Sequence, residues 1–183
     1  MRRLRNNEGF GLIELLMAMT MLNIGILAIV AAFNSGALAL ARASKTSTAT
    51  AIADQQMELF RGLKYANIEQ TTTGWTAATA DSTWTADSVY QTKMQAPVAP
   101  VALIPTVSNC PNSVADASGY SCNPSSTRTG PDGRTYRVDT YMYYDTPTGG
   151  EQTKVVTVVV RNPNNLSGSL ARESSTFDIT TGS

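Results

Sequence analysis

Apolar side chains are concentrated in one stretch near the N-terminus. No charged residue occurs between Glu14 and Arg42, and residues 15–33 are almost wholly apolar. A helix needs about 20 apolar residues to cross the hydrocarbon core of a bilayer, so the pattern predicts a membrane-spanning helix over residues 10–33. A short basic head of three arginines precedes it. An excess of cations before a span places that end in the cytoplasm and the following chain outside.

An ordinary cleaved secretory signal is the alternative for this stretch. The apolar region of a signal peptide runs about 7–15 residues and ends at a small-residue cleavage site. Here helix-forming sequence continues through residues 37–43. A signal peptide would also leave the carboxylate of Glu14 at the membrane edge unexplained. The membrane-spanning helix is therefore the favoured interpretation.

Helical spacing continues beyond the span, over residues 34–65. The sequence has no proline from Ala37 to Tyr65. Apolar side chains recur there at helical spacing among charged ones, namely Ile52, Met57, Leu59, Phe60 and Leu63. Such a stripe is typical of a helix that packs against a sheet. We therefore expect one long helix whose outer half is amphipathic.

Residues 66–133 are rich in Thr, Ser, Ala, Asn and Pro. This composition predicts mainly connecting loop, with a ligand-binding loop as the less favoured alternative. Trp75 and Trp84 lie in this region and are expected to flank short strands. The favoured strand within it covers residues 88–94.

Two strong strand patterns follow. Residues 134–144 alternate between two faces, and residues 153–161 are rich in valine, as in a central strand. Residues 146–150 predict a hairpin loop between them, and residues 174–180 predict a last strand. One face of the first strand is expected to carry Tyr136, Val138, Thr140 and Met142, and the other Arg137, Asp139, Tyr141 and Tyr143. We expect an antiparallel sheet of three or four strands.

Composition argues against an enzyme. Lys plus Arg and Asp plus Glu number 14 each, and the chain has no histidine, the commonest general base and metal ligand. The scattered carboxylates Asp139 and Asp145 have no motif around them. The tyrosine-rich strand face lacks a Lys/Arg patch, so cross-strand packing is favoured over a nucleic-acid stacking surface. No catalytic, cofactor or metal site is predicted.

Cys110 and Cys122 are the only two cysteines. A location outside the cytoplasm permits a disulfide, which would close a small loop and contribute about 2–3 kcal/mol. The alternatives are two unpaired thiols or half of a metal site, and the absence of histidine disfavours the second. The spacing is not that of the redox dithiol motif. A structural disulfide is favoured.

Glu14 is the anomaly of the span. A carboxylate there costs about 2.5–3.5 kcal/mol on insertion scales, and the span itself offers no cation. Cleavage after Gly9 would supply one, because the new α-amino group of Phe10 is cationic near neutral pH. Phe10 and Glu14 stand i and i+4 on one helix face. The pair can form within one chain or between staggered neighbours, and the second arrangement would fix the register of an assembly.

A basic leader, Gly9, Phe10 and then Glu14 ahead of an apolar helix together form a recognisable N-terminus. It resembles the precursors of type IV pilins and the pseudopilins of type II secretion, over about residues 1–40. The resemblance implies removal of residues 1–9 by prepilin peptidase after Gly9 and N-methylation of Phe10. It also implies that Glu14 neutralises the N-terminus of a neighbouring subunit.

Two departures from the family pattern bear on the type of subunit. Gly11 stands where the family more often has Thr or Ser, which scarcely changes the resemblance. Major pilins commonly carry a proline within the spanning helix, whereas this chain has none before Pro97. The difference favours a minor pilin or pseudopilin over a main structural subunit.

The resemblance implies a pilin-like α+β fold, in which a long N-terminal helix packs on a small antiparallel sheet. Residues 66–183 would form a β-rich domain outside the cytoplasmic membrane. The implied function is a structural subunit of a type IV pilus or type II secretion-like filament. Implied partners are prepilin peptidase, other pilin or pseudopilin subunits, the inner-membrane assembly platform and lipid, without a cofactor or nucleic acid.

The alternative function is a single-pass, membrane-anchored extracytoplasmic binding domain that does not polymerise. This alternative predicts no cleavage after Gly9 and no effect of replacing Glu14. The sequence leaves open whether a filament would serve adhesion, DNA uptake, motility or secretion, since a shared N-terminus indicates only a shared assembly route.

Overall fold

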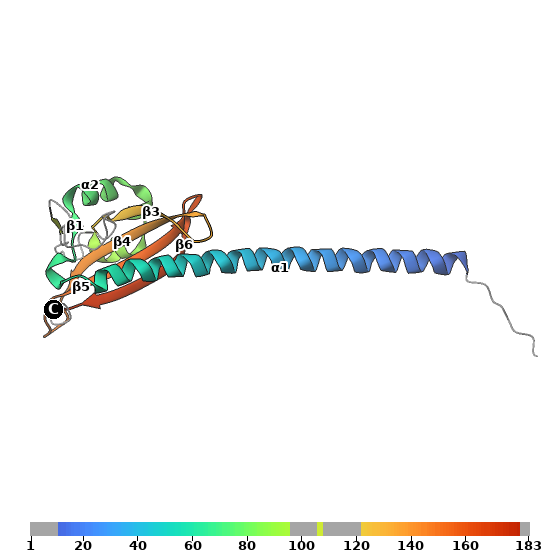
Figure 1. Ribbon diagram of the computed structural model, residues 1–183, viewed down its shortest axis with the longest axis horizontal. Coiled ribbons are helices and arrows are strands. Elements are labelled where there is room, and N and C mark those ends of the chain that lie inside the picture. The colour runs from blue at the N-terminus through green and yellow to red at the C-terminus, as the bar shows by residue number, and fades with distance from the viewer. Residues whose placement is uncertain (1–10, 96–105, 108–121, 180–183) are drawn as a thin grey trace, which may run out of the picture. The chain divides into compact units, whose positions relative to one another are not determined.

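The structure is a computed structural model that describes residues 11–95, 106–107 and 122–179 (Figure 1). The chain divides into two compact units, Met1–Ser44 and Lys45–Ser183. A long helix, α1 (Leu12–Arg61), begins in the first unit and ends in the second. Together with a four-stranded antiparallel sheet, α1 gives the chain the predicted α+β fold.

Helix α1 is uninterrupted because its sequence lacks proline and is rich in alanine and leucine. It ends at Arg61, four residues before the predicted end, and Gly62 and a short 3-10 turn, η1 (Tyr65–Asn67), follow. The predicted stripe of the outer half is confirmed, except that Leu59 is only partly buried. The buried residues of α1 are Ala49, Ile52, Ala53, Gln56, Met57 and Phe60.

The sheet has the strand order β3-β4-β5-β6, and every neighbouring pair is antiparallel. Its strands are β3 (Ser125–Thr129), β4 (Thr135–Asp145), β5 (Thr153–Asn162) and β6 (Asn165–Phe177). The two strong strand predictions and the hairpin loop between them are confirmed, with Gly149 at a φ of 80° in that loop. The last strand begins nine residues earlier than expected, at Asn165.

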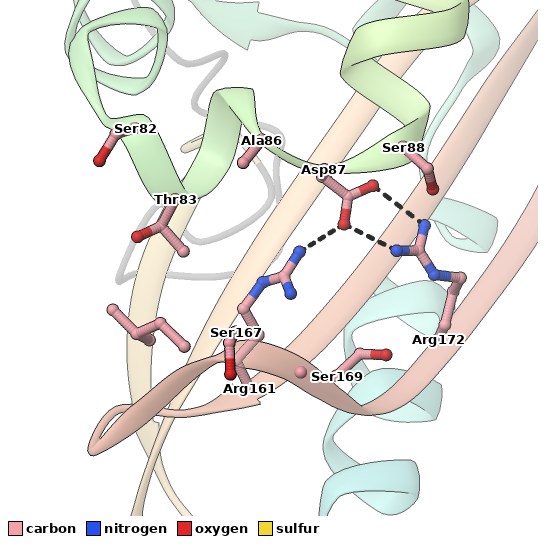
Figure 2. A pocket seen from close by; sticks show the side chains of 11 residues that line it. Ser82, Thr83, Ala86, Asp87, Ser88, Arg161, Ser167, Ser169 and Arg172 are labelled. Carbon is pink, nitrogen blue, oxygen red and sulfur yellow. Dashed lines mark hydrogen bonds and ion pairs between the residues drawn. The ribbon is translucent and has the colours of Figure 1, made fainter.

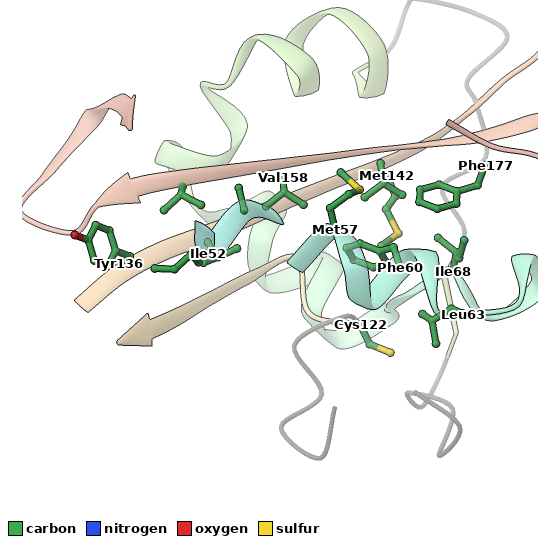
Figure 3. Close-up of a cluster of buried hydrophobic side chains, with 14 of the residues drawn as sticks. Ile52, Met57, Phe60, Leu63, Ile68, Cys122, Tyr136, Met142, Val158 and Phe177 are labelled. Carbon is green, nitrogen blue, oxygen red and sulfur yellow. The ribbon is translucent and has the colours of Figure 1, made fainter. Parts of the chain in front are cut away.

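One face of the sheet packs against the last turns of α1. Met57 and Phe60 of α1 share an apolar cluster with Met142 of β4 and Val158 of β5 (Figure 3). Tyr141 and Val159, which neighbour these strand residues in sequence, belong to a second cluster instead. Since successive strand side chains point to opposite faces, the sheet carries apolar clusters on both sides.

Helices cover the second face, so the prediction of loop and strand is wrong for residues 72–94. Residues 72–94 form α2 (Thr72–Ala80), α3 (Ser82–Thr85) and a π-helical turn, η2 (Tyr90–Met94). The strand expected at residues 88–94 is therefore helical. A two-residue parallel pair joins β1 (Gln70–Thr71) and β2 (Thr106–Val107).

Capping side chains explain these helices. Thr71 accepts a hydrogen bond from the Gly74 amide at 3.1 Å, and Asp81 accepts one from the Thr83 amide at 2.8 Å. Each satisfies a backbone donor that a helix N-terminus otherwise leaves free. Thr and Asp residues that suggest loop by composition therefore start helices here.

The two tryptophans lie on these helices and do not flank strands. Trp84 is fully buried and stacks on Tyr141 of β4, with ring centroids 4.7 Å apart, and Trp75 meets Trp84 edge-on at 5.3 Å. The Tyr141 hydroxyl donates to the Trp84 carbonyl at 3.1 Å. Tyr141 is thus a core residue, but its aromatic partner lies on a helix and not on a neighbouring strand as the cross-strand prediction required.

Candidate membrane and assembly segment

The first unit exposes the apolar side chains that it carries. All residues of α1 from Leu12 to Ser44 are exposed, and the large apolar ones range from 50 % exposed at Ile26 to 78 % at Leu12. These large apolar residues are Leu12, Ile13, Leu15, Leu16, Met17, Met19, Met21, Leu22, Ile24, Ile26, Leu27, Ile29, Val30, Phe33, Leu38 and Leu40. Monomeric soluble proteins rarely expose an apolar surface this continuous. The surface is suited to lipid or to other helices.

Helix α1 includes one stretch that is long and apolar enough to cross a membrane. Two hydroxyl groups within it are satisfied by the helix itself. Thr20 Oγ1 donates to the Met17 carbonyl at 2.8 Å, and Ser35 Oγ donates to the Ala32 carbonyl at 3.0 Å. Because a helix also satisfies its backbone groups internally, this segment is compatible with a single membrane span.

Glu14 lies in the first turn of α1, and its side chain reaches back toward the helix start. The Gly11 amide donates to Glu14 Oε2 at 3.4 Å. This contact is half of a capping box, and a carboxylate at a helix N-terminus is also favoured by the helix dipole. No cation contacts Glu14 within the described part of the chain. Gly9 and Phe10 lie outside the described residues, so the cleavage and N-methylation sites stay predictions.

Asn23 differs from Thr20, the other polar residue within residues 15–33. Its carboxamide is exposed and has no hydrogen-bond partner among residues 11–95, 106–107 and 122–179. An unsatisfied polar group in the hydrocarbon core costs several kcal/mol. In a bilayer this amide therefore requires a partner from another molecule.

No protein-family model, curated protein or solved structure matches the chain. The function of this protein therefore has to be inferred from its own residues and geometry.

A buried ion-pair network, which sequence analysis did not anticipate, lies on the second face of the sheet. It alternates in charge along Arg172, Asp87, Arg161, Asp139, Arg137 and Asp81. The three arginines come from β6, β5 and β4, whereas Asp81 and Asp87 flank α3. The network therefore ties the helical layer to three strands.

Asp87 and Asp139 are the junctions of this network. Arg161 and Arg172 both donate to the Asp87 carboxylate (Figure 2). The hydrogen bond from Arg172 Nη2 is 2.7 Å long. Asp139 accepts from Arg137 Nε at 2.8 Å and Arg161 Nε at 3.1 Å. The side chains of both aspartates are at most 2 % exposed. Every charge at these junctions is therefore paired.

The network also changes the titration of Asp87. Burial alone raises the pKa of this carboxyl group, but a hydrogen bond from Arg172, the Val89 amide and the charges of Arg172 and Arg161 outweigh it. The pKa of Asp87 therefore lies below its usual value. Asp81 follows the same pattern, because hydrogen bonds from the Thr83 amide and Arg137 outweigh its desolvation and lower its pKa.

The structure does not bring together the two carboxylates that sequence analysis weighed as enzyme candidates. Asp139 is fully buried in ion pairs, and Ser125 Oγ also donates to it at 2.8 Å. Asp145 is exposed at the end of the same strand. The six residue steps between them along the extended strand correspond to about 20 Å. In the described part of the chain, no cluster of three metal-binding side chains occurs either.

A groove of about 580 Å³ borders Asp87 (Figure 2). Its lining is dominated by hydroxyl groups from the region of α3 and from the start of β6, including Ser82, Ser88 and Ser167. The two arginines in the lining already pair with Asp87. These ion pairs hold α3 and the sheet together and leave no free charge on the two arginines for a ligand.

Cys122 lies in the cluster between α1 and the sheet. It is 1 % exposed and is not a free thiol. Its predicted partner, Cys110, lies outside the described residues, so the Cys110–Cys122 disulfide stays a prediction.

Proposed function

We propose that this protein is a pilin-like structural subunit, a minor pilin or pseudopilin of a type IV pilus or type II secretion-like filament. In this proposal the first part of α1 spans the cytoplasmic membrane, with the N-terminus inside and the second unit outside. Prepilin peptidase cuts after Gly9 and methylates Phe10. The supporting observation is an exposed apolar helix that continues into a separately packed α+β unit.

Glu14 fixes the stagger of neighbouring subunits in this proposal. After cleavage, the Phe10 amine is the nearest cation that a neighbouring helix can offer at the same depth. The Glu14 carboxylate is exposed, and within the described residues it accepts only the 3.4 Å contact from the Gly11 amide, so it remains accessible to that amine. A charged pair in a low-dielectric surrounding is far stronger than one in water. It therefore selects one register among many apolar ones.

Asn23 supports association of the helices as well. Its unsatisfied amide lies nine residues after Glu14, well inside the apolar stretch. Polar side chains in membrane helices hydrogen-bond across helix interfaces, with model peptides giving about 1–2 kcal/mol. A second subunit helix supplies such a partner, whereas lipid chains do not.

The proposed partners follow from this assembly route. They are prepilin peptidase, other pilin or pseudopilin subunits, the inner-membrane assembly platform and membrane lipid. The role is structural and uses no enzyme activity, cofactor or nucleic acid. In this proposal, the exposed apolar surface of α1 becomes buried against other helices as the subunit leaves the bilayer.

A second candidate is a membrane-anchored binding domain that does not polymerise. One observation favours it: the Gly11 amide already donates to Glu14, so helix capping alone can account for this carboxylate. The two candidates differ in what the Glu14 side chain contacts, because only assembly requires a neighbouring chain.

Replacing Glu14 with alanine is expected to reduce the filament-incorporated fraction of the protein by at least about tenfold. Loss of a buried interfacial charge pair costs about 2–5 kcal/mol, and each 1.4 kcal/mol is tenfold. Asn23→Leu should reduce incorporation by a smaller factor. The measurement is quantitative immunoblotting of sheared filaments and membranes from cells that carry a pilin assembly system.

Glu58→Ala is the matched control, because Glu58 is an exposed acid of α1 in the second unit. It should incorporate like the wild type, and all variants should reach the membrane fraction equally. Normal incorporation of Glu14→Ala would instead support the capping role and the non-polymerising domain.

A further inference from the structure

The second unit has a polar groove beside Lys45, the first residue of this unit. The groove has a volume of about 370 Å³. It is lined by Lys45, Arg134, Thr135, Tyr136, Asn162, Pro163, Asn164 and Leu170. Both charged residues of this lining are cations, which makes the groove suited to an anion.

Local packing places Arg134 beside Lys45. The turn between β3 and β4 lies against α1 so closely that a Cβ on Gly130 would come within 2.6 Å of Thr48 Cγ2. The Gly130 amide donates to the Arg134 carbonyl at 2.8 Å and closes this turn. Glycine at position 130 therefore permits the contact that brings Arg134 to the helix face of Lys45.

The charge of the groove is only partly compensated. Arg134 Nη1 lies 3.3 Å from Asp132, whose side chain is 15 % exposed, while that of Arg134 is 52 % exposed. Asp132 also accepts from the Tyr136 hydroxyl at 2.7 Å. Lys45 has no ion-pair partner in the part of the chain that the structure describes. One net positive charge remains, together with the amide groups of Asn162 and Asn164.

Lys45, which lines this groove, closely follows the apolar stretch in the sequence. The uncharged residues 15–41 rise about 40 Å as a helix, close to the thickness of a bilayer with its headgroups. Arg42 follows at once and precedes Lys45 by three residues in the sequence. The next acidic residue along α1 is Asp54. The chain therefore leaves the apolar stretch through a purely cationic segment.

We propose that this groove binds the headgroup of an anionic phospholipid. This inference rests on the proposed function, in which the first part of α1 spans the membrane. The phosphate would contact Lys45 and Arg134, and the asparagine amides would donate to its oxygens. Each cation near a membrane surface strengthens attraction to anionic lipid by about fivefold. The site would hold the second unit at the bilayer until the subunit is extracted.

The test uses the full chain in phosphatidylcholine vesicles that contain traces of spin-labelled phosphatidylglycerol or phosphatidylcholine. Electron paramagnetic resonance then gives the fraction of each lipid immobilised by the protein. The wild type is expected to prefer phosphatidylglycerol by on the order of fivefold at low salt. The double variant Lys45→Gln/Arg134→Gln should fall within about twofold of parity. Lys45→Arg/Arg134→Lys should keep the preference, because it keeps both charges.

The matched control is Lys64→Gln/Lys93→Gln, which removes two exposed cations elsewhere in the second unit. It should retain the wild-type preference. An equal fall in the control, or an unchanged preference in Lys45→Gln/Arg134→Gln, would overturn the lipid site. Displacement of the labelled lipid by millimolar glycerol 3-phosphate would overturn it too, since the site would then hold a free phosphate ester.

Vesicle flotation separates this inference from the proposed function. A chain that does not float with the vesicles would overturn the membrane span and, with it, the lipid site. A chain that floats but shows no preference for phosphatidylglycerol would overturn the lipid site alone.

Discussion

Replacing Trp84 with alanine is expected to lower the free energy of unfolding by about 3–5 kcal/mol. Trp84 has no exposed surface, and its ring contacts Tyr141, Trp75 and Tyr90 with centroid distances of 4.7, 5.3 and 5.1 Å. Truncation would leave a cavity between the helical layer and the sheet, which the surrounding side chains fill only in part. The measurement is hydrogen exchange of β4 and β5 amides in detergent micelles, where the slowest amides report global opening.

Two further variants test this explanation. Trp84→Phe keeps an aromatic ring on Tyr141 and should cost clearly less than Trp84→Ala. Trp75→Ala should also cost less, since Trp75 is only partly buried in the same cluster. A larger loss for Trp75→Ala than for Trp84→Ala would contradict the central position of Trp84.

Replacing Asp87 with alanine is expected to destabilise the second unit by about 3–5 kcal/mol, the range measured when one partner of a buried ion pair is removed. Arg172 would lose both of its hydrogen bonds to that carboxylate, and Arg161 would keep Asp139 as its ion-pair partner. The measurement is urea unfolding in detergent followed by fluorescence of Trp75 and Trp84. Glu58→Ala is the control, because its exposed pair with Arg61 should contribute less than about 1 kcal/mol.

The Asp87 contribution also has a defined pH dependence. Since the folded-state pKa of Asp87 is lowered, its stabilisation is present above the unfolded-state value of about 3.9 and is lost as the pH falls through the folded-state pKa. The wild type should therefore lose stability below about pH 4 more steeply than Asp87→Ala. Parallel pH profiles for the two proteins would contradict the ion-pair assignment.

The two central strands of the sheet were predictable because their signals are local. Five of the ten residues of β5 are valine, and both faces of this strand are buried, with Val158 in one cluster and Val159 in the other. Periodicity within β4 and the turn-forming residues 146–150 located the hairpin. Such patterns need no knowledge of distant parts of the chain.

The helical layer and the ion-pair network were not predictable in this way. Thr71 and Asp81 cap helices, but in a stretch rich in Thr and Ser their capping role is indistinguishable from loop composition. Arg161 and Asp87 are 74 residues apart, and no local pattern indicates that they meet. Glu14, in contrast, was identifiable because a carboxylate beside a long apolar stretch is itself a local anomaly.

The most direct test of the pilin-like assignment is the N-terminus of the protein, expressed with and without a prepilin peptidase. Intact mass and N-terminal sequencing would be measured on the two samples. The proposal predicts a peptidase-dependent start at Phe10, with the added mass of one methyl group. A chain that retains Met1 in the presence of an active peptidase would contradict it.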